Sequence, residues 1–301
     1  MNFRVLTPVH ISSGQTLTKY EFIIKGSKFQ FYSFDEIINY IDRKEIAKFL
    51  FDAGLEEFFK HYNLNIKPTY EIPFHSAPKD KVYEFIKLKN SVYIPGSSIK
   101  GAIRTAYLYR IIKNDNNLRN EFLNLIRSRN FKNFYRAIEK KIDDIFRRIL
   151  VSDSELFDPS GCLKVVEIKH KNLSLAVEVL RENFEFEIDI KFKYNNLKNE
   201  IDNAISEFSK DLVNYLKSIG IYNNLADLEK NKKLIRLGKF KGYFSNTIML
   251  ILFYFDKDLY EKYKKKTFWK TIDGKPLGFC EVSFDWVFDK LLNKVFTLSN
   301  K

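Results

Sequence analysis

The feature that most constrains the fold is the stretch at residues 93–107, which reads YIPGSSIKGAIRTAY. Pro95-Gly96 is a turn pair, and the apolar residues after it recur at the i, i+3, i+4 spacing of an amphipathic helix. Ser97 or Ser98 stands where a helix N-cap is expected. The stretch therefore predicts a strand that ends, turns and opens into a helix.

The start of this helix has properties that suit an anion. The first backbone N–H groups of a helix have no intrahelical partner, and the helix dipole is positive there. Lys100 and Arg104 are four residues apart and add two cations to one face. Gly101 disfavours the helix by about 0.8–1 kcal/mol relative to Ala, which indicates that a backbone or a ligand comes close. The alternative is an ordinary capped helix with solvated cations, and these residues alone do not decide between the two.

The charge balance also indicates an anionic partner. The chain has 51 Lys and Arg against 38 Asp and Glu, a net charge of +13, which favours a partner such as nucleic acid. A hydrophobic fraction of 45% supports real cores, and a charged fraction of 30% argues against a disordered or membrane-embedded chain. The longest apolar run, residues 248–255, is far shorter than the ~20 residues that span a bilayer. With no signal-peptide pattern before Pro8, we expect a cytoplasmic protein without a membrane partner.

The length of 301 residues predicts two domains at roughly 150 residues each. The polar, turn-rich stretch at residues 151–161 predicts the boundary between the two domains. This gives an N-terminal domain of residues 1–160 and a C-terminal domain of residues 161–301. Strand and helix patterns occur in both halves, which indicates an α+β fold. The expected strands are residues 3–11, a hairpin at residues 20–34, and residues 165–168, 175–180, 184–192 and 279–284. The expected helices are residues 35–61 in two pieces, 99–150 with a break at 114–117, 196–218 and 286–296.

A basic loop at residues 234–246 carries a second candidate site for RNA. Residues 230–241 hold six cations and no acid. Gly238 and Gly242 permit a close approach of the backbone, while Lys239 and Lys241 supply charge. The aromatic side chains that could stack on bases are Phe240, Tyr243 and Phe244. The alternative is a basic turn ahead of a buried helix that Ser245 or Asn246 caps.

The sequence shows no motif for a metal or a cofactor. The histidines His10, His61, His75 and His170 form no HExxH, the two cysteines form no CxxC, and no Walker loop or GxGxxG is present. The carboxylates of Asp143-Asp144 diverge if they lie on a helix, and a metal role for them or for Asp153 and Glu155 is disfavoured. We therefore expect neither a metal nor another cofactor.

His10 is the one candidate acid or base beside a loop, next to Ser12 and Ser13. Such a histidine could cleave RNA without a metal, through attack by a 2′-hydroxyl. The alternatives are a packed, hydrogen-bonded histidine or a contact to RNA, and spacing alone does not choose among them.

The order of four segments resembles the RAMP superfamily of CRISPR systems. The segments are residues 6–14 (LTPVHISSG), 94–104 (IPGSSIKGAIR), 177–188 (with VEVL and FEFEI) and 237–244 (LGKFKGYF). Residues 94–104 are the most specific of them. Within the superfamily, the chain resembles the family of the fifth subunit of the Csm (type III-A) effector complex.

The resemblance implies two ferredoxin-like, RRM-related domains with helical insertions. It also implies a non-catalytic subunit in antiviral defence that binds and caps the 3′ end of the guide crRNA, a single-stranded RNA, and contacts the adjacent backbone subunit. The positions it implies to face RNA are His10, Ser12, Ser13, Gly14, Ser97, Ser98, Lys100, Arg104, Gly238, Lys239, Lys241 and Gly242. The chain departs from the family pattern in its GKFKG loop, where small or glycine residues are frequent. The alternatives are a metal-independent RAMP endoribonuclease that processes guide RNA through His10, and a scaffold that contacts only protein subunits.

Overall fold

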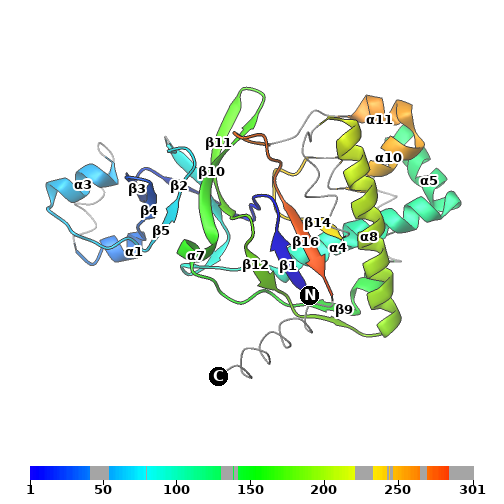
Figure 1. Ribbon diagram of the computed structural model, residues 1–301, viewed down its shortest axis with the longest axis horizontal. Coiled ribbons are helices and arrows are strands. Elements are labelled where there is room, and N and C mark those ends of the chain that lie inside the picture. Colours follow the sequence, from blue (N-terminus) through cyan, green and yellow to red (C-terminus); the bar gives the residue numbers. More distant parts are fainter. Residues whose placement is uncertain are drawn as a thin grey trace, which may run out of the picture.

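The computed structural model describes residues 1–40, 54–78, 80–129, 138, 142–220, 233–242, 244, 247–264 and 270–284 (Figure 1). The helix expected at residues 286–296 lies outside the described residues, as does the middle of the helical region expected at 35–61. Sheets and packed helices together confirm the expected α+β class. No helix in the described ranges is both long enough and apolar enough to cross a membrane.

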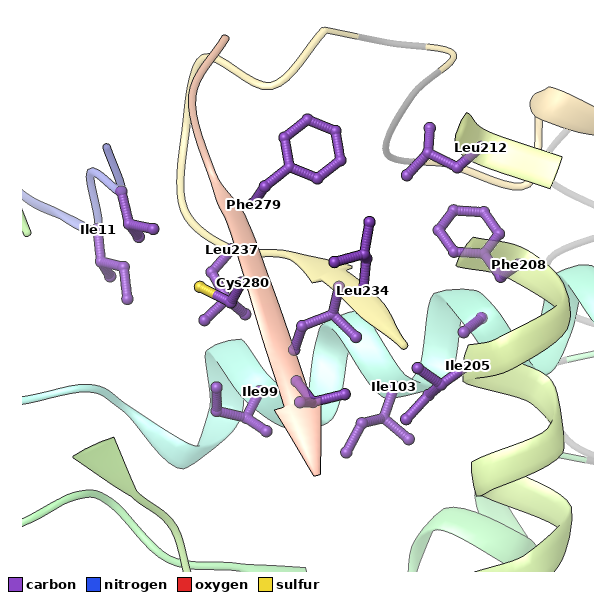
Figure 2. Close-up of a cluster of buried hydrophobic side chains, with 14 of the residues drawn as sticks. Ile11, Ile99, Ile103, Ile205, Phe208, Leu212, Leu234, Leu237, Phe279 and Cys280 are labelled. Carbon is purple, nitrogen blue, oxygen red and sulfur yellow. The ribbon is translucent and has the colours of Figure 1, made fainter. Parts of the chain in front are cut away.

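A four-stranded antiparallel sheet is the first of two larger sheets in the described part of the protein. In spatial order its strands are β12 (Glu185–Glu187), β1 (Asn2–Val5), β16 (Phe279–Ser283) and β14 (Leu234–Arg236). Two helices pack against it, α4 (Gly96–Asn114) and α8 (Asn195–Ser218). Figure 2 shows Ile103 of α4 and Ile205 of α8 next to Leu234 of the sheet. The apolar stripes of both helices are therefore buried against the sheet.

A five-stranded sheet lies beside the first (Figure 1). Its strands are, in spatial order, β15 (Lys270–Thr271), β10 (Leu163–His170), β11 (Leu173–Leu180), β6 (Lys81–Phe85) and β2 (Ser12–Thr18). β11 and β6 are parallel and the other neighbours are antiparallel. One hydrophobic cluster includes Val82 and Val165 of this sheet together with Phe3 and Val282 of the other, so the two sheets share a core.

Smaller elements surround these sheets. A three-stranded sheet of β3 (Phe22–Lys25), β4 (Lys28–Phe31) and β5 (Tyr70–Pro73) lies at one end of the molecule with α1 (Phe34–Ile37) and α3 (Leu55–His61) (Figure 1). Two short pairs are β7 (Lys87–Leu88) with β8 (Ser91–Val92), and β9 (Ile149–Val151) with β13 (Ile190–Phe192). The other helices in the described ranges are α5 (Asn116–Arg127), α7 (Pro159–Cys162), α10 (Leu250–Phe255) and α11 (Lys257–Tyr263).

Several expected elements end at other positions. The strand expected at residues 184–192 is two strands, because β12 pairs with β1 whereas β13 pairs with β9. The expected helix at residues 99–150 begins at Gly96 and breaks at Asp115, whose carboxylate accepts a hydrogen bond from the Leu118 amide and caps α5. The first strand ends at Val5 rather than at residue 11.

Each larger sheet combines strands from both sides of residue 160. β1 pairs with β12 and with β16, and β2 and β6 lie in the same sheet as β10 and β11. The boundary expected between residues 1–160 and 161–301 thus runs through hydrogen-bonded sheets. As a division into separate domains it stays a prediction.

Candidate nucleic-acid interface

The N-terminal segment and the glycine-bearing loop are in direct contact. The Lys239 amide donates a hydrogen bond of 2.8 Å to the His10 carbonyl oxygen. Gly238 has a φ of +77°, and a Cβ built on it would lie 2.0 Å from that same oxygen. Only glycine fits here, because both the backbone conformation and the space exclude a side chain. The structure therefore brings together two of the three segments expected to face RNA.

His10 is fully buried rather than displayed on a loop. Its Nδ1 lies 2.7 Å from the Glu178 carbonyl oxygen, and since a carbonyl only accepts, Nδ1 carries the proton of the neutral ring. Burial lowers the pKa of His10 to about 4. The imidazole packs against the rings of Phe85 and Phe240, with 5.5 Å between the His10 and Phe240 centroids. His10 is thus a neutral, weakly basic group beneath the glycine-bearing loop.

A buried polar network around Glu178 fixes the position of His10. The Glu178 carboxylate accepts hydrogen bonds from the Tyr70 hydroxyl at 2.6 Å, the Phe85 amide at 2.9 Å and the Lys87 ammonium at 2.5 Å. Burial, and then the Glu178 carboxylate, raises the pKa of Tyr70 well above its usual value. The network joins β5, β6, β7 and β11. The sequence-based predictions did not include this network, although the charged residue inside the apolar run VEVL was a usable signal.

Ser12, Ser13 and Gly14 belong to strand β2 rather than to a loop. The register between β2 and β6 shifts between Ser12 and Thr16, as at a β-bulge. The Ser12 hydroxyl accepts a hydrogen bond from the Gly14 amide, and the Ser13 hydroxyl accepts one from the Gln15 amide, both at 3.0 Å. Gly14 is exposed with a φ of +93°. This edge strand follows directly after the buried His10.

The two lysines of the glycine-bearing loop have different surroundings. The Lys239 side chain is exposed. The Lys241 ammonium donates a hydrogen bond of 2.9 Å to the Arg236 carbonyl oxygen, and burial, followed by the charge of Arg236, lowers the pKa of Lys241 to about 7. Gly242 has a φ of +81° and closes the loop. Lys239 is therefore the more exposed cation of this pair.

The aromatic residues expected to stack on bases also differ. Phe240 is half-buried, but Phe244 is 2% exposed and packs against Tyr260, so Phe244 belongs to the core. Tyr243, and the expected capping residues Ser245 and Asn246, lie outside the described residues. Among the described residues of this loop, Phe240 is the partly exposed aromatic side chain, and its ring packs against His10 and Tyr83.

The start of α4 is covered by the protein's own carboxylate. The helix begins at Gly96 with Pro95 as N-cap, so Ser97 and Ser98 lie in its first turn and the expectation that one of them caps it was wrong. The Asp153 carboxylate accepts a hydrogen bond of 2.7 Å from the Gly96 amide. Asp153 thus satisfies one of the free amides that a bound anion would use.

The cations of α4 are also engaged. The Lys100 ammonium donates a hydrogen bond of 2.8 Å to the Ile149 carbonyl oxygen. Arg104 forms a salt bridge of 3.0 Å with Asp143. Among the described residues, no heavy atom lies within 4 Å of a Cβ built on Gly101, so the close approach expected there does not come from them. Lys100 holds α4 against β9, a structural role that the sequence did not indicate.

A shallow depression of about 470 Å³ lies between the first turns of α4 and the β9–β13 pair. Its lining residues are Gly96, Ser97, Lys100, Leu150, Val151, Ser152, Asp189 and Lys191. Lys191 is largely exposed and pairs with Asp189 at 3.5 Å. Ser97 and Lys100 therefore line a surface groove of mixed apolar and polar residues, although the helix end itself is capped.

The three expected RNA-facing segments meet through their apolar residues. Figure 2 shows Ile11 of the N-terminal segment, Ile99 of α4 and Leu237 of the glycine-bearing loop in one buried cluster around Cys280 of β16. Hydrogen bonds join the first segment to the third, whereas α4 joins them through this core. The three segments thus contribute apolar side chains to the same part of the core.

Comparison with known proteins identifies the family. The model of the RAMP superfamily matches residues 2–245. The chain belongs to the RAMP superfamily. This RAMP protein is 27% identical over 70% of its length to a protein named Csm5 from Streptococcus thermophilus, of which it covers 67%. It is 26% identical over 84% of its length to a Csm5 from Methanocaldococcus jannaschii, of which it covers 73%. The expected resemblance to the fifth Csm subunit is confirmed.

Solved structures show the same fold. This RAMP protein superposes on the crystal structure of T. onnurineus Csm5 with a TM-score of 0.69 at 20% identity, over 93% of this chain and 100% of that one. It also superposes on a chain of a Csm–crRNA–target RNA ternary complex of a type III-A system, with a TM-score of 0.72 at 20% identity. This superposition covers 94% of this chain and 99% of that one.

The described residues of this RAMP protein contain no group of three or more His, Cys, Asp or Glu side chains placed to hold a metal ion. Asp153, considered above as a metal ligand from sequence, caps α4, and Asp143 pairs with Arg104. Cys162 and Cys280 are buried free thiols. Burial raises the pKa of the Cys162 thiol to about 12, so this thiol is a packing group at neutral pH.

Proposed function

We propose that this RAMP protein is a non-catalytic subunit of a type III-A CRISPR effector complex in antiviral defence. In this proposal it binds and caps the 3′ end of the guide crRNA, contacts the adjacent backbone RAMP subunit and acts in the cytoplasm. Two relatives named Csm5, and a fold shared with a chain of a Csm–crRNA–target RNA complex, support the assembly. We also propose that the two larger sheets correspond to the two ferredoxin-like domains of the family.

The observation that carries the RNA-binding part is the contact between His10 and the glycine-bearing loop. It places the exposed Lys239 and the half-buried Phe240 beside the edge strand that begins at Ser12. A cation, a stacking ring and backbone brought close by glycine are the groups that hold single-stranded RNA without reading its sequence. Ser13, Gly14 and Gly242 flank them, while Ser97, Ser98, Lys100 and Arg104 form the more distant α4 part of the proposed surface.

The geometry of His10 argues for binding rather than cleavage. A general base works best with a pKa near the working pH and must reach the proton that it removes. The His10 ring is fully buried, and its pKa is lowered to about 4. A pKa this far below the working pH leaves the ring a weak base, which does not suit the alternative endoribonuclease.

The test is reconstitution of the complex with and without this subunit. We expect its omission to leave the 3′ end of bound crRNA open to an added single-strand nuclease, while the 5′ part stays protected. The isolated chain should bind labelled single-stranded RNA with an affinity that falls steeply with salt. Site-specific cleavage of guide RNA in EDTA that is lost in His10→Ala would instead establish the endoribonuclease, and complete protection without the subunit would contradict capping.

A further inference from the structure

The imidazole of His10 has one nitrogen that the fold leaves without a partner. Nδ1 is hydrogen-bonded to the Glu178 carbonyl oxygen, but Nε2 is buried and has no hydrogen-bond partner in the described part of the chain. A buried polar atom left unpaired costs about 1–3 kcal/mol. Most buried polar side chains are paired, so this exception needs an explanation.

The protonation of the ring determines what Nε2 can bind. Because Nδ1 donates to a carbonyl, Nε2 of the neutral ring bears a lone pair and can only accept. The pKa of about 4 keeps this form at neutral pH. A phosphate oxygen is itself an acceptor and cannot pair with it. The group that fits is a donor, such as a hydroxyl or an N–H.

The Phe240 ring covers the imidazole from the loop and also packs against Tyr83, with 6.3 Å between the Phe240 and Tyr83 ring centroids. Phe85, one of the two aromatic rings against His10, is fully buried on β6, whereas the other, Phe240, is half-buried on the loop. Phe240 has a φ of +63°, which disfavours a residue with a side chain, and it stands between Gly238 at +77° and Gly242 at +81°. Glycines on both sides permit the backbone changes that lift the Phe240 ring from the imidazole.

We propose that Phe240 covers a ribonucleotide subsite, in which His10 Nε2 accepts a hydrogen bond from a ribose 2′-hydroxyl once the Phe240 ring has moved aside. This inference rests on the proposed function, since it needs RNA at the glycine-bearing loop. The exposed Lys239, whose amide is bonded to the His10 carbonyl oxygen, is placed to hold the adjacent phosphate. The 2′-hydroxyl is the donor that separates RNA from DNA, so the subsite gives discrimination without base reading.

The test uses the full-length chain with a labelled single-stranded RNA and the all-deoxy strand of identical base sequence, at one salt concentration. The His10→Asn variant retains a donor to the Glu178 carbonyl oxygen but has no acceptor at the Nε2 position. His10→Gln places an amide at that position and is the matched control. We expect His10→Asn to weaken RNA binding by roughly five- to tenfold without changing DNA binding, and His10→Gln to keep most of the discrimination. Phe240→Ala should raise the RNA-to-DNA affinity ratio.

The outcomes separate the two proposals. An unchanged RNA-to-DNA ratio in His10→Asn overturns the subsite, as does equal loss on RNA and DNA, which would indicate a donor on the bases. Absence of RNA binding by the wild type overturns the proposed function and the subsite together. If His10→Asn fails to fold, the ¹⁵N resonance of His10 Nε2 in the wild type decides. It should shift on addition of RNA but not of the deoxy strand, and no RNA-specific shift overturns the subsite.

Discussion

The Lys239 amide and the His10 carbonyl oxygen are joined by a hydrogen bond of 2.8 Å between segments that lie far apart in the sequence. This bond is possible because Gly238, next to Lys239, has no side chain. It brings the loop that carries Phe240 over the buried imidazole. The candidate RNA surface therefore depends on a long-range contact rather than on either segment alone.

Replacing Gly238 should disrupt this contact. In Gly238→Ala the new Cβ would lie 2.0 Å from the His10 carbonyl oxygen at a φ of +77°, so strain and overlap add. We expect a loss of about 2–5 kcal/mol in the free energy of unfolding. Gly220→Ala is the matched control, since its φ is +64° but no atom of the described residues lies within 4 Å of its Cβ. It should cost about 1–2 kcal/mol. Equal losses in urea denaturation would show that the contact does not constrain the loop.

The buried ion pair beneath His10 should be a second sensitive point. Lys87 and Glu178 are 2.5 Å apart, with side chains 4% and 0% exposed. Removing one partner leaves a buried charge unpaired, so Lys87→Met should cost about 3–5 kcal/mol in unfolding free energy. The control is Lys164→Met, because Lys164 pairs with Glu182 at 2.6 Å in a partly exposed site. We expect a loss of about 1 kcal/mol or less there. The double variant of Lys87→Met with Glu178→Gln should lose less than the sum of the single losses; additive losses would argue against the pair.

Local patterns predicted most single elements correctly. The helical period of residues 196–218 predicted α8, and the strand-like runs at residues 165–168 and 175–180 predicted β10 and β11. These predictions succeeded because the apolar face of each element is buried in the core. The pairing of β1 with β16 was not predictable in this way, since register between distant strands leaves no local mark.

The side-chain partners of the candidate site were less accessible to sequence reasoning. Lys100 and Lys239 look alike in sequence, yet Lys100 is bonded to the Ile149 carbonyl oxygen and Lys239 is exposed. His10 likewise followed an apolar alternation that gave no sign of Glu178 beside it. Such contacts arise from the tertiary arrangement. Candidate binding residues could therefore be named from the sequence, but whether each is exposed or buried could not be predicted.

The two lysines of the glycine-bearing loop should respond differently to substitution. Lys239→Ala removes an exposed cation, so we expect weaker RNA binding. The slope of the logarithm of the RNA-binding constant against the logarithm of the salt concentration should become less steep by about 0.7, and the melting temperature should not change. Lys60, 72% exposed on the distant helix α3, is the control, and Lys60→Ala should leave the slope unchanged. Lys241→Ala should lower the melting temperature, because Lys241 packs within the loop and bonds to the Arg236 carbonyl oxygen. The same slope change in Lys60→Ala would mean that charge alone, not this loop, governs binding.

The pH dependence of stability should report the burial of His10. The pKa of His10 is lowered from 6.5 to about 4 in the folded protein, so between these values the unfolded chain binds a proton that the folded chain does not. Stability contributed by the neutral ring is complete above pH 6.5 and is lost as the pH falls towards 4, by at most about 1.4 kcal/mol per pH unit. The measurement is urea denaturation between pH 6.5 and 5, above the range in which most carboxylates titrate. His10→Asn should lose less stability over this interval than the wild type, because its side chain does not titrate. Parallel curves for the two proteins would contradict a buried, neutral His10.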